Sequence, residues 1–284
     1  MALASLTISP AIVGASVGPI AHEIDARWLM AYAAGLAETD ARYYDTLAPG
    51  GPAAHPLFPV CYEWPALLAL RAVTTSDEMA IRSVHATHDL VLHRPIRPRE
   101  TLHTTARVSG LAHRRAGTLM TVRLETIDAA GRPVTSSDYG SVYRGVAFEG
   151  ADAGHAPPPR EAAMASGGEV LRVDIPAGLA HIYSECARIW NPIHTDIAIA
   201  RAAGLPGIIL HGTATLALAV SCVLRHAGVD PRMVRRISGR FTDMVPLPSS
   251  LAVHLASPSG DGTFRFDVTR DDEVVMRGGA LHLA

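Results

Sequence analysis

The segment Pro206–Leu224, PGIILHGTATLALAVSCVL, decides the fold because it is long and apolar. Pro206, His211 and Gly212 interrupt it, so it falls short of the run of about 20 apolar residues that spans a membrane. A helix that is apolar on almost every side is typical of a buried core. Such a helix needs cover all round, and a curled sheet supplies that cover. We therefore expect a central helix enclosed by strands.

A second apolar segment, Pro56–Val73 (PLFPVCYEWPALLALRAV), lies in the first half of the chain. Each apolar segment follows a short amphipathic pattern, which is Ala26–Leu36 in the first half and Gly178–Ile189 in the second. A shift of about 150 positions lays Tyr32 over Tyr183, as an internal repeat would. Strand-like runs then follow in both halves, at residues 85–93, 101–109, 118–127 and 136–144, and at residues 234–241, 250–256, 263–268 and 273–283.

These patterns predict an α+β fold made of two similar halves, each a curved antiparallel sheet wrapped around a long helix. Pairing the two sheets edge to edge would remove their exposed edges. The stretch Phe148–Glu169 is rich in Gly, Pro and Ala and predicts a linker. The expected divisions are residues 1–147, 148–169 and 170–284. The alternative is two unrelated α+β domains.

The composition narrows the class of protein. The chain has 284 residues, 48% of them hydrophobic and 18% charged, which is typical of a well-cored soluble protein. The net charge of −2 and the lack of a basic patch argue against nucleic acid as a partner. No uninterrupted apolar run predicts a membrane span, and the N-terminal stretch lacks the basic region of a signal peptide.

Cysteines and histidines give no sign of a metal. The three cysteines lie far apart without a CxxC spacing, so we expect neither disulfides nor zinc and take a cytoplasmic location as the default. His85, His88 and His93 form the densest histidine run. Along a regular strand His85 and His93 would face one side and His88 the other, so we expect no metal there.

The stretch Trp190–Asp196, WNPIHTD, carries the most informative chemistry. Pro192 fixes its own φ and pushes Asn191 toward extended geometry, which predicts that the preceding helix ends here. A histidine held just after such a turn, as His194 is, suits proton transfer. Asp196 is expected to cap the following short helix rather than to act as an acid.

Asn191, Pro192 and His194, with the downstream pair His211-Gly212, resemble the MaoC-like, R-specific enoyl-CoA hydratase group of the hotdog superfamily. The order of elements extends the resemblance over most of the chain, with the first half similar to the degenerate N-terminal hotdog of double-hotdog members. The resemblance implies a duplicated hotdog fold whose first half forms a wall of the acyl pocket. It also implies a lyase of fatty acid metabolism, a hydratase or dehydratase.

The implied reaction is the hydration of a trans-2-enoyl-CoA to an (R)-3-hydroxyacyl-CoA, or the reverse dehydration. His194 would be the acid and base, Asn191 would orient the water or the histidine, and the Gly212 N–H would hold the thioester oxygen. His211 would orient the start of the helix. The resemblance implies no cofactor beyond the CoA thioester substrate. Acyl-CoA or acyl carrier protein is the expected partner, and a homodimer is left open.

The sequence departs from the family pattern at one place. The motif Gly-Asp-x-Asn-Pro-x-His would put an Asp where this chain has Ile189, and a Gly where it has Arg188. Glu185, one helical turn earlier, would project from the same face and could replace the missing carboxylate. Alternatively, His194 would both take and give the proton, or the site would be inactive or repurposed. Arg188 would pair with a CoA phosphate or with Glu185, or would lie on the surface.

Two other functions stay open at this point. A hotdog acyl-CoA thioesterase is the enzymatic alternative, because fold alone does not settle function. A non-catalytic subunit that binds acyl thioesters is the other, and Ile189 would explain it directly.

Overall fold

The computed structural model describes residues 6–155, 168–257 and 260–284. Most of the expected linker, residues 156–167, therefore lies outside the described residues. In the first half the elements are β1 (Thr7–Ile8), β2 (Ser16–Ile24), α1 (Ala26–Gly35), α2 (Pro59–Thr74), α3 (Asp77–Ala80), β3 (Ser83–Leu92), β4 (Glu100–Arg114), β5 (Gly117–Asp128), β6 (Pro133–Arg144), β7 (Ala147–Phe148) and β8 (Ala153–Gly154).

The second half, described from residue 168, repeats the main order of these elements. Its elements are β9 (Glu169–Ile175), α4 (Leu179–Ala187), α5 (Ile197–Ala202), α6 (Gly212–Ala227), β10 (Val234–Phe241), β11 (Ser249–Leu255), β12 (Thr263–Arg270) and β13 (Glu273–Leu283). Among the described residues, each half also has two short 3-10 helices. They are η1 (Pro10–Ile12) and η2 (Ala41–Tyr43) in the first half, and η3 (Pro192–His194) and η4 (Pro231–Met233) in the second.

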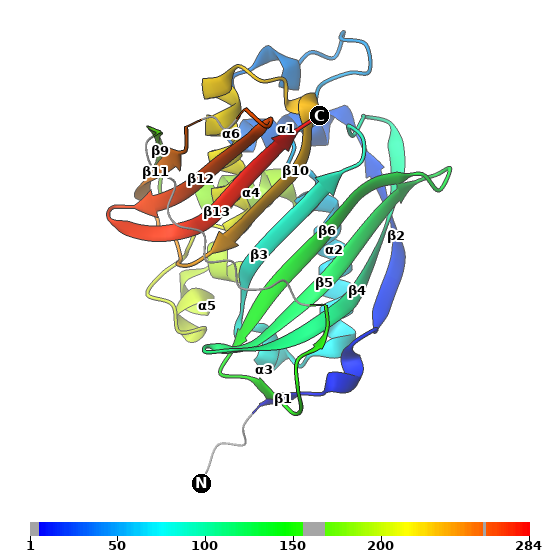
Figure 1. Cartoon of the computed structure of the whole chain (residues 1–284), viewed down its shortest axis with the longest axis vertical. Helices are drawn as coiled ribbons and strands as arrows, with labels where there is room; N and C mark the ends of the chain where they lie inside the picture. Colours follow the sequence, from blue (N-terminus) through cyan, green and yellow to red (C-terminus); the bar gives the residue numbers. More distant parts are fainter. Residues whose placement is uncertain (1–5, 156–167, 258–259) are drawn as a thin grey trace.

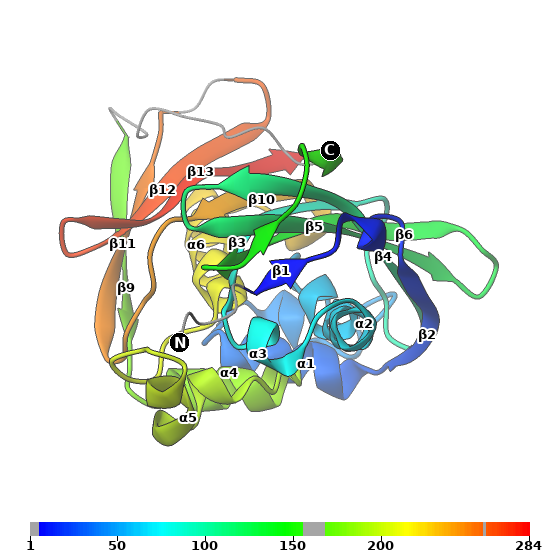
Figure 2. The same ribbon diagram turned by 90° about the horizontal axis from the view of Figure 1, so that it is seen from below.

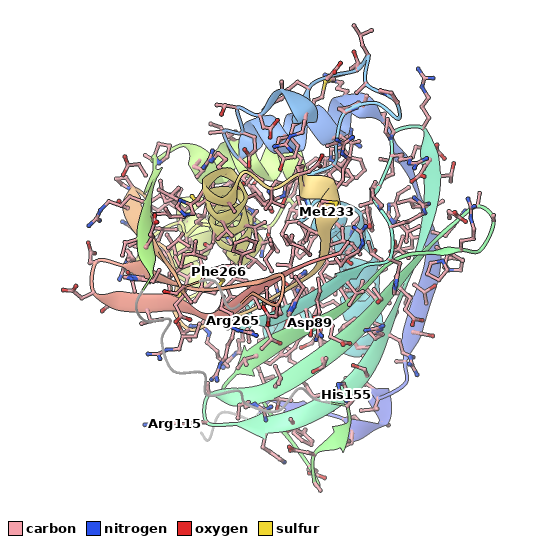
Figure 3. The ribbon with its side chains drawn as sticks, turned by 45° about the horizontal axis from the view of Figure 1, so that its top comes forward. Asp89, Arg115, His155, Met233, Arg265 and Phe266 are labelled. Carbon is pink, nitrogen blue, oxygen red and sulfur yellow. The ribbon has the colours of Figure 1, made fainter. Side chains whose placement is uncertain are left out.

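One large sheet runs through both halves in the order β2-β4-β5-β6-β3-β10-β13-β12-β11-β9. The order is symmetric about its centre, because the five strands of the second half mirror the five of the first. Strands β3 and β10 pair antiparallel at this joint (Figure 1), where Arg236 Nε donates to Asp89 Oδ1 at 2.8 Å. Figure 3 shows Asp89 on the sheet at this joint. The expected edge-to-edge pairing of a duplicated fold is confirmed.

The sheet curls over helices α2 and α6, and helices α1 and α4 lie side by side on the open side (Figure 2). Every residue of α6 from Thr213 to Leu224 is buried, as the apolar sequence requires. Tyr32 of α1 and Tyr183 of α4 are fully buried, and their hydroxyl oxygens lie 3.3 Å apart. The two tyrosines that the repeat aligns therefore meet at the contact between the halves.

Two helix boundaries differ from the expectation. The helix expected from Pro206 begins only at Gly212, because the Leu210 N–H donates to the Val245 carbonyl and holds the preceding residues extended. The helix expected to reach Ile189 ends at Ala187, where Arg188 takes a left-handed conformation with φ +57°. Strands β2 and β9, which open the two sheets, had no clear sequence signal. Among the described residues, no helix is long and apolar enough to cross a membrane.

Candidate active site

A cavity lies between the two halves and encloses about 980 Å³, including the part that opens to solvent. The first half contributes one face of α2 together with residues of β3 and β6. The second half contributes Ile189, the η3 turn, the start of α6 and the loop after β10. A cavity between two structural halves is a common location for a small-molecule site.

His194 is the last residue of η3 and is buried in the cavity wall with 8% of its surface exposed. Its Nδ1 lies 2.8 Å from the Ile209 carbonyl oxygen. Because a carbonyl only accepts hydrogen bonds, Nδ1 must carry the proton, and the neutral ring keeps its lone pair on Nε2. Burial lowers the pKa of His194 to about 4, so the ring is neutral at pH 7. The residue is therefore a base with a fixed tautomer.

The ring of His211 stacks on that of His194 with centroids 3.7 Å apart. His211 is the N-cap of α6, and its Nε2 lies 3.2 Å from the Ser184 hydroxyl. Burial, and secondarily the neighbouring His194, hold the pKa of His211 well below its usual value. A neutral His211 therefore supports the position of the His194 ring without competing for its proton.

Gly212 is the first residue of α6 and lines the same cavity. Among the described residues, nothing accepts a hydrogen bond from its backbone N–H. The amide stands at the N-terminus of a 16-residue helix, where the partial positive charge favours an anion. A Cβ built on Gly212 would meet the Phe241 ring at 3.5 Å, an ordinary contact. The amide is thus unpaired among the described residues and available to a ligand oxygen at the cavity wall.

The other sequence-predicted residues divide into two groups. Asn191 lines the cavity beside His194, and so does Ile189, whose side chain is 5% exposed. Glu185 and Arg188 are both exposed and do not line it. Glu185 accepts a hydrogen bond from Trp190 Nε1 at 3.2 Å, and the Arg188 guanidinium lies 4.1 Å from the centre of the Trp28 ring.

The expectation that Glu185 shares a face with Ile189 is therefore wrong. It assumed a helix through Ile189, but the left-handed Arg188 ends α4 and turns the chain. The same turn directs the Arg188 side chain toward Trp28 of the first half. The structure brings Asn191, His194, His211 and Gly212 together and leaves Glu185 and Arg188 outside.

Glu63 is a cavity residue that the sequence reasoning missed. It lies on α2 with 1% of its surface exposed. Its Oε1 accepts a hydrogen bond from the Ser137 hydroxyl at 2.5 Å, whereas its Oε2 is buried without a hydrogen-bond partner. Burial raises the pKa of Glu63 to about 7. The available signal was a single carboxylate within the apolar segment of the first half.

The histidine run also differs from its expectation. A β-bulge between His85 and Thr87 brings the rings of His85 and His88 to a centroid distance of 5.4 Å, although a regular strand would have separated them. His85 lines the cavity and stacks on Tyr139, with centroids 3.9 Å apart. Among the described residues, no group of three His, Cys, Asp or Glu side chains is arranged to hold a metal.

Two family models match the chain. Residues 182–275 match the MaoC-like domain, and residues 11–137 match the dehydratase domain region of the FAS1-like type. Together they cover the core of both halves, including the η3 turn and the start of α6.

Sequence relatives agree with these models. The chain is 26% identical over 207 residues to 3-hydroxyacyl-thioester dehydratase X of Mycobacterium tuberculosis, which covers 72% of this chain and 70% of that protein. It is 36% identical over 105 residues to the fatty acid synthase beta subunit pkiC of Emericella nidulans, and this match covers 34% of the present chain. The chain matches only 6% of the length of that synthase subunit.

The fold is also found in solved structures. The crystal structure of a MaoC-like dehydratase from Phytophthora capsici superposes with a TM-score of 0.83 at 20% identity, and the match covers 97% of each chain. The superposition therefore extends over both halves of the fold.

Proposed function

The chain is a double-hotdog member of the MaoC-like dehydratase family, and from this premise we propose that it catalyses the reversible addition of water to a trans-2-enoyl thioester. The product is an (R)-3-hydroxyacyl thioester carried on CoA or on acyl carrier protein. One observation carries the proposal: the neutral base His194 and the free N–H of Gly212 line one cavity. Enoyl hydration needs a base for the water and a donor for the thioester oxygen.

In the proposed reaction His194 Nε2 takes a proton from water, and the water oxygen forms a bond to the β-carbon. The π electrons of the double bond move to the α-carbon and the thioester carbonyl, so negative charge gathers on the carbonyl oxygen. The Gly212 N–H and the N-terminus of α6 bind this oxygen. The His194 imidazolium then returns the proton to the α-carbon, which restores the neutral ring and completes the product.

Ile189 supports a mechanism with a single proton carrier. It occupies the cavity wall where the family motif has an Asp, so no carboxylate from that position can share the proton transfer. The hydrogen bond from Nδ1 to the Ile209 carbonyl holds the ring while its charge changes, and the carbonyl stabilises the imidazolium form. We therefore assign both proton transfers to His194.

The test follows two products at once. The loss of enoyl absorbance is measured with crotonyl-CoA and longer 2-enoyl-CoA thioesters, and the release of free thiol is measured in the same samples. We expect loss of absorbance without thiol release. Thiol release instead would identify a thioesterase. Binding of acyl-CoA without either reaction, across all chain lengths, would identify a non-catalytic binding protein.

A further inference from the structure

The carboxyl group of Glu63 is set into the cavity wall with half of its hydrogen-bonding capacity unused. Ser137 occupies Oε1, and Oε2 has no partner in the part of the chain that the structure describes. A buried polar atom without a partner costs about 1–3 kcal/mol. A ligand that fills the cavity and offers a partner to Oε2 would remove this cost, whereas an apolar ligand would keep it.

The surroundings of Glu63 are polar as well. His85, Tyr139 and Ser141 line the same cavity, and with Glu63 we call them the polar wall. All four belong to the first half, which we take to form the acyl side of the site. The other first-half side chains of the lining include Val60, Trp64 and Leu67, which are largely apolar. A plain fatty acyl chain offers no hydrogen bonds. When it fills the pocket, each polar side chain in the wall loses its bound water without gaining a new hydrogen-bond partner, which costs free energy.

The protonation state of the Glu63 carboxyl group limits the class of ligand that it can bind. With the pKa of Glu63 raised to about 7, the protonated and ionised forms are both populated near neutral pH. The protonated form donates a hydrogen bond, and the ionised form accepts one. A hydroxyl group pairs with either form. A ligand carboxylate pairs with the protonated form only, because the ionised form repels it.

We infer that the acyl pocket selects thioesters whose acyl chain bears a hydroxyl group beyond the reacting carbons, and that Glu63 binds this hydroxyl. The inference rests on the proposed function for the orientation of the substrate. It adds a substrate class, the hydroxylated acyl thioesters, and makes Glu63 the residue that determines specificity.

The experiment compares matched substrates. A series of 2-enoyl-CoA thioesters with a terminal hydroxyl is paired with the plain chains of the same carbon number, and kcat/KM is measured for each. At the chain length that reaches Glu63, we expect the hydroxylated substrate to be favoured by about tenfold, the effect of one buried hydrogen bond. Equal or higher kcat/KM for the plain chains at every length would overturn the inference.

Three variants locate the preference. Glu63→Leu should abolish it, and Glu63→Gln should retain most of it because the amide both donates and accepts. Leu67→Ala, one helical turn further along α2 in the same cavity wall, is the control and should change both substrates equally. A preference that survives in Glu63→Leu would contradict the role of Glu63. So would a loss of kcat in Glu63→Gln that is equal for both substrates, because that result identifies a proton carrier.

A binding measurement separates this inference from the proposed function. Calorimetry with saturated acyl-CoA and ω-hydroxyacyl-CoA pairs needs no reaction. If no enoyl-CoA is hydrated but ω-hydroxyacyl-CoA still binds about tenfold more tightly, the proposed reaction is wrong and the pocket assignment stands. If hydration occurs and neither kcat/KM nor binding shows a preference, the reaction stands and the pocket assignment fails.

Discussion

The two halves of the molecule share one fold but differ at two positions that matter for chemistry. The first-half turn η2 ends in Tyr43, which is buried against Ala33 and Ala53, whereas the second-half turn η3 ends in His194, which faces the cavity. The first-half central helix begins with Pro59, which has no N–H, whereas the second begins with Gly212.

These two differences show how a duplicated fold separates roles. At these positions the first half has neither a histidine nor an amide donor, and we propose that it shapes the pocket. The second half has both, with the histidine in η3 and the amide at the start of α6. In the proposed function the chemistry belongs to the second half and substrate selection to the first, and each prediction below tests one of these two assignments.

The largest expected effect belongs to His194. Replacing it with alanine removes the only base we assign, so kcat for enoyl hydration should fall by about 10²–10⁴-fold. Binding of saturated acyl-CoA should change little. His254→Ala is the matched control, because His254 is a partly buried histidine of the same half that bonds to Thr269 away from the cavity. Similar losses of kcat in both variants would mean that the fold, not the base, was affected.

Gly212→Pro makes the start of α6 resemble that of α2. His211 already has φ −61° and ψ 138°, which suit a residue before proline, and proline is favoured as the first residue of a helix. The fold should survive while the amide donor is lost, so kcat should fall by about 10²–10³-fold. Gly212→Ala keeps the N–H and has room beside Phe241. Equal kcat in the two variants would exclude the amide as the oxygen donor.

Glu63→Gln tests the buried carboxyl group of the first half through stability. The folded pKa is raised from 4.5 to about 7, so the contribution of Glu63 to stability is present below pH 4.5 and is lost as pH rises through about 7. The free energy of unfolding of wild type should therefore fall by about 3 kcal/mol relative to the variant over this range. Denaturant titrations at about pH 4.5 and pH 8 measure this difference. Parallel pH dependences would show that Glu63 is not buried as described.

Tyr32→Phe gives the smallest effect, because it removes only the hydroxyl that contacts Tyr183 across the halves and donates to the Leu57 carbonyl at 3.3 Å. Tyr183 keeps its bond to the Thr213 hydroxyl at 3.1 Å, and the Leu57 carbonyl keeps the Val60 N–H, so no partner is stranded. The free energy of unfolding should fall by about 1 kcal/mol with kcat unchanged. The matched control is Tyr44→Phe, which also removes a tyrosine hydroxyl. This hydroxyl donates to the Glu38 carbonyl within the first half. A large loss of kcat in Tyr32→Phe alone would place Tyr32 in the site.

The fold could be predicted because its signals are local and repeated. The apolar segments, their spacing and the alternating strands recur in both halves, so weak evidence in one supports the other. The mirrored order of strands about the β3–β10 joint follows from this duplication. Strands β2 and β9 were missed because they stand apart from the regular runs that follow each central helix.

The site could be predicted only where its residues lie within one motif. Asn191, His194 and the His211-Gly212 pair belong to two neighbouring stretches of the second half. Glu63 comes from the other half, and only the three-dimensional packing of α2 places it in the cavity. Glu185 was misplaced because the left-handed conformation of Arg188, a non-glycine residue, has no clear sequence signal.

The most direct test of this division of roles is the pH dependence of kcat/KM for an unsubstituted 2-enoyl-CoA, measured after rapid pH jumps with wild type and Glu63→Gln. If His194 alone carries the proton, both profiles should rise through a single ionisation near pH 4 and coincide through pH 7. An inflection near pH 7 in wild type that is absent from Glu63→Gln would place a proton carrier in the first half and contradict the account.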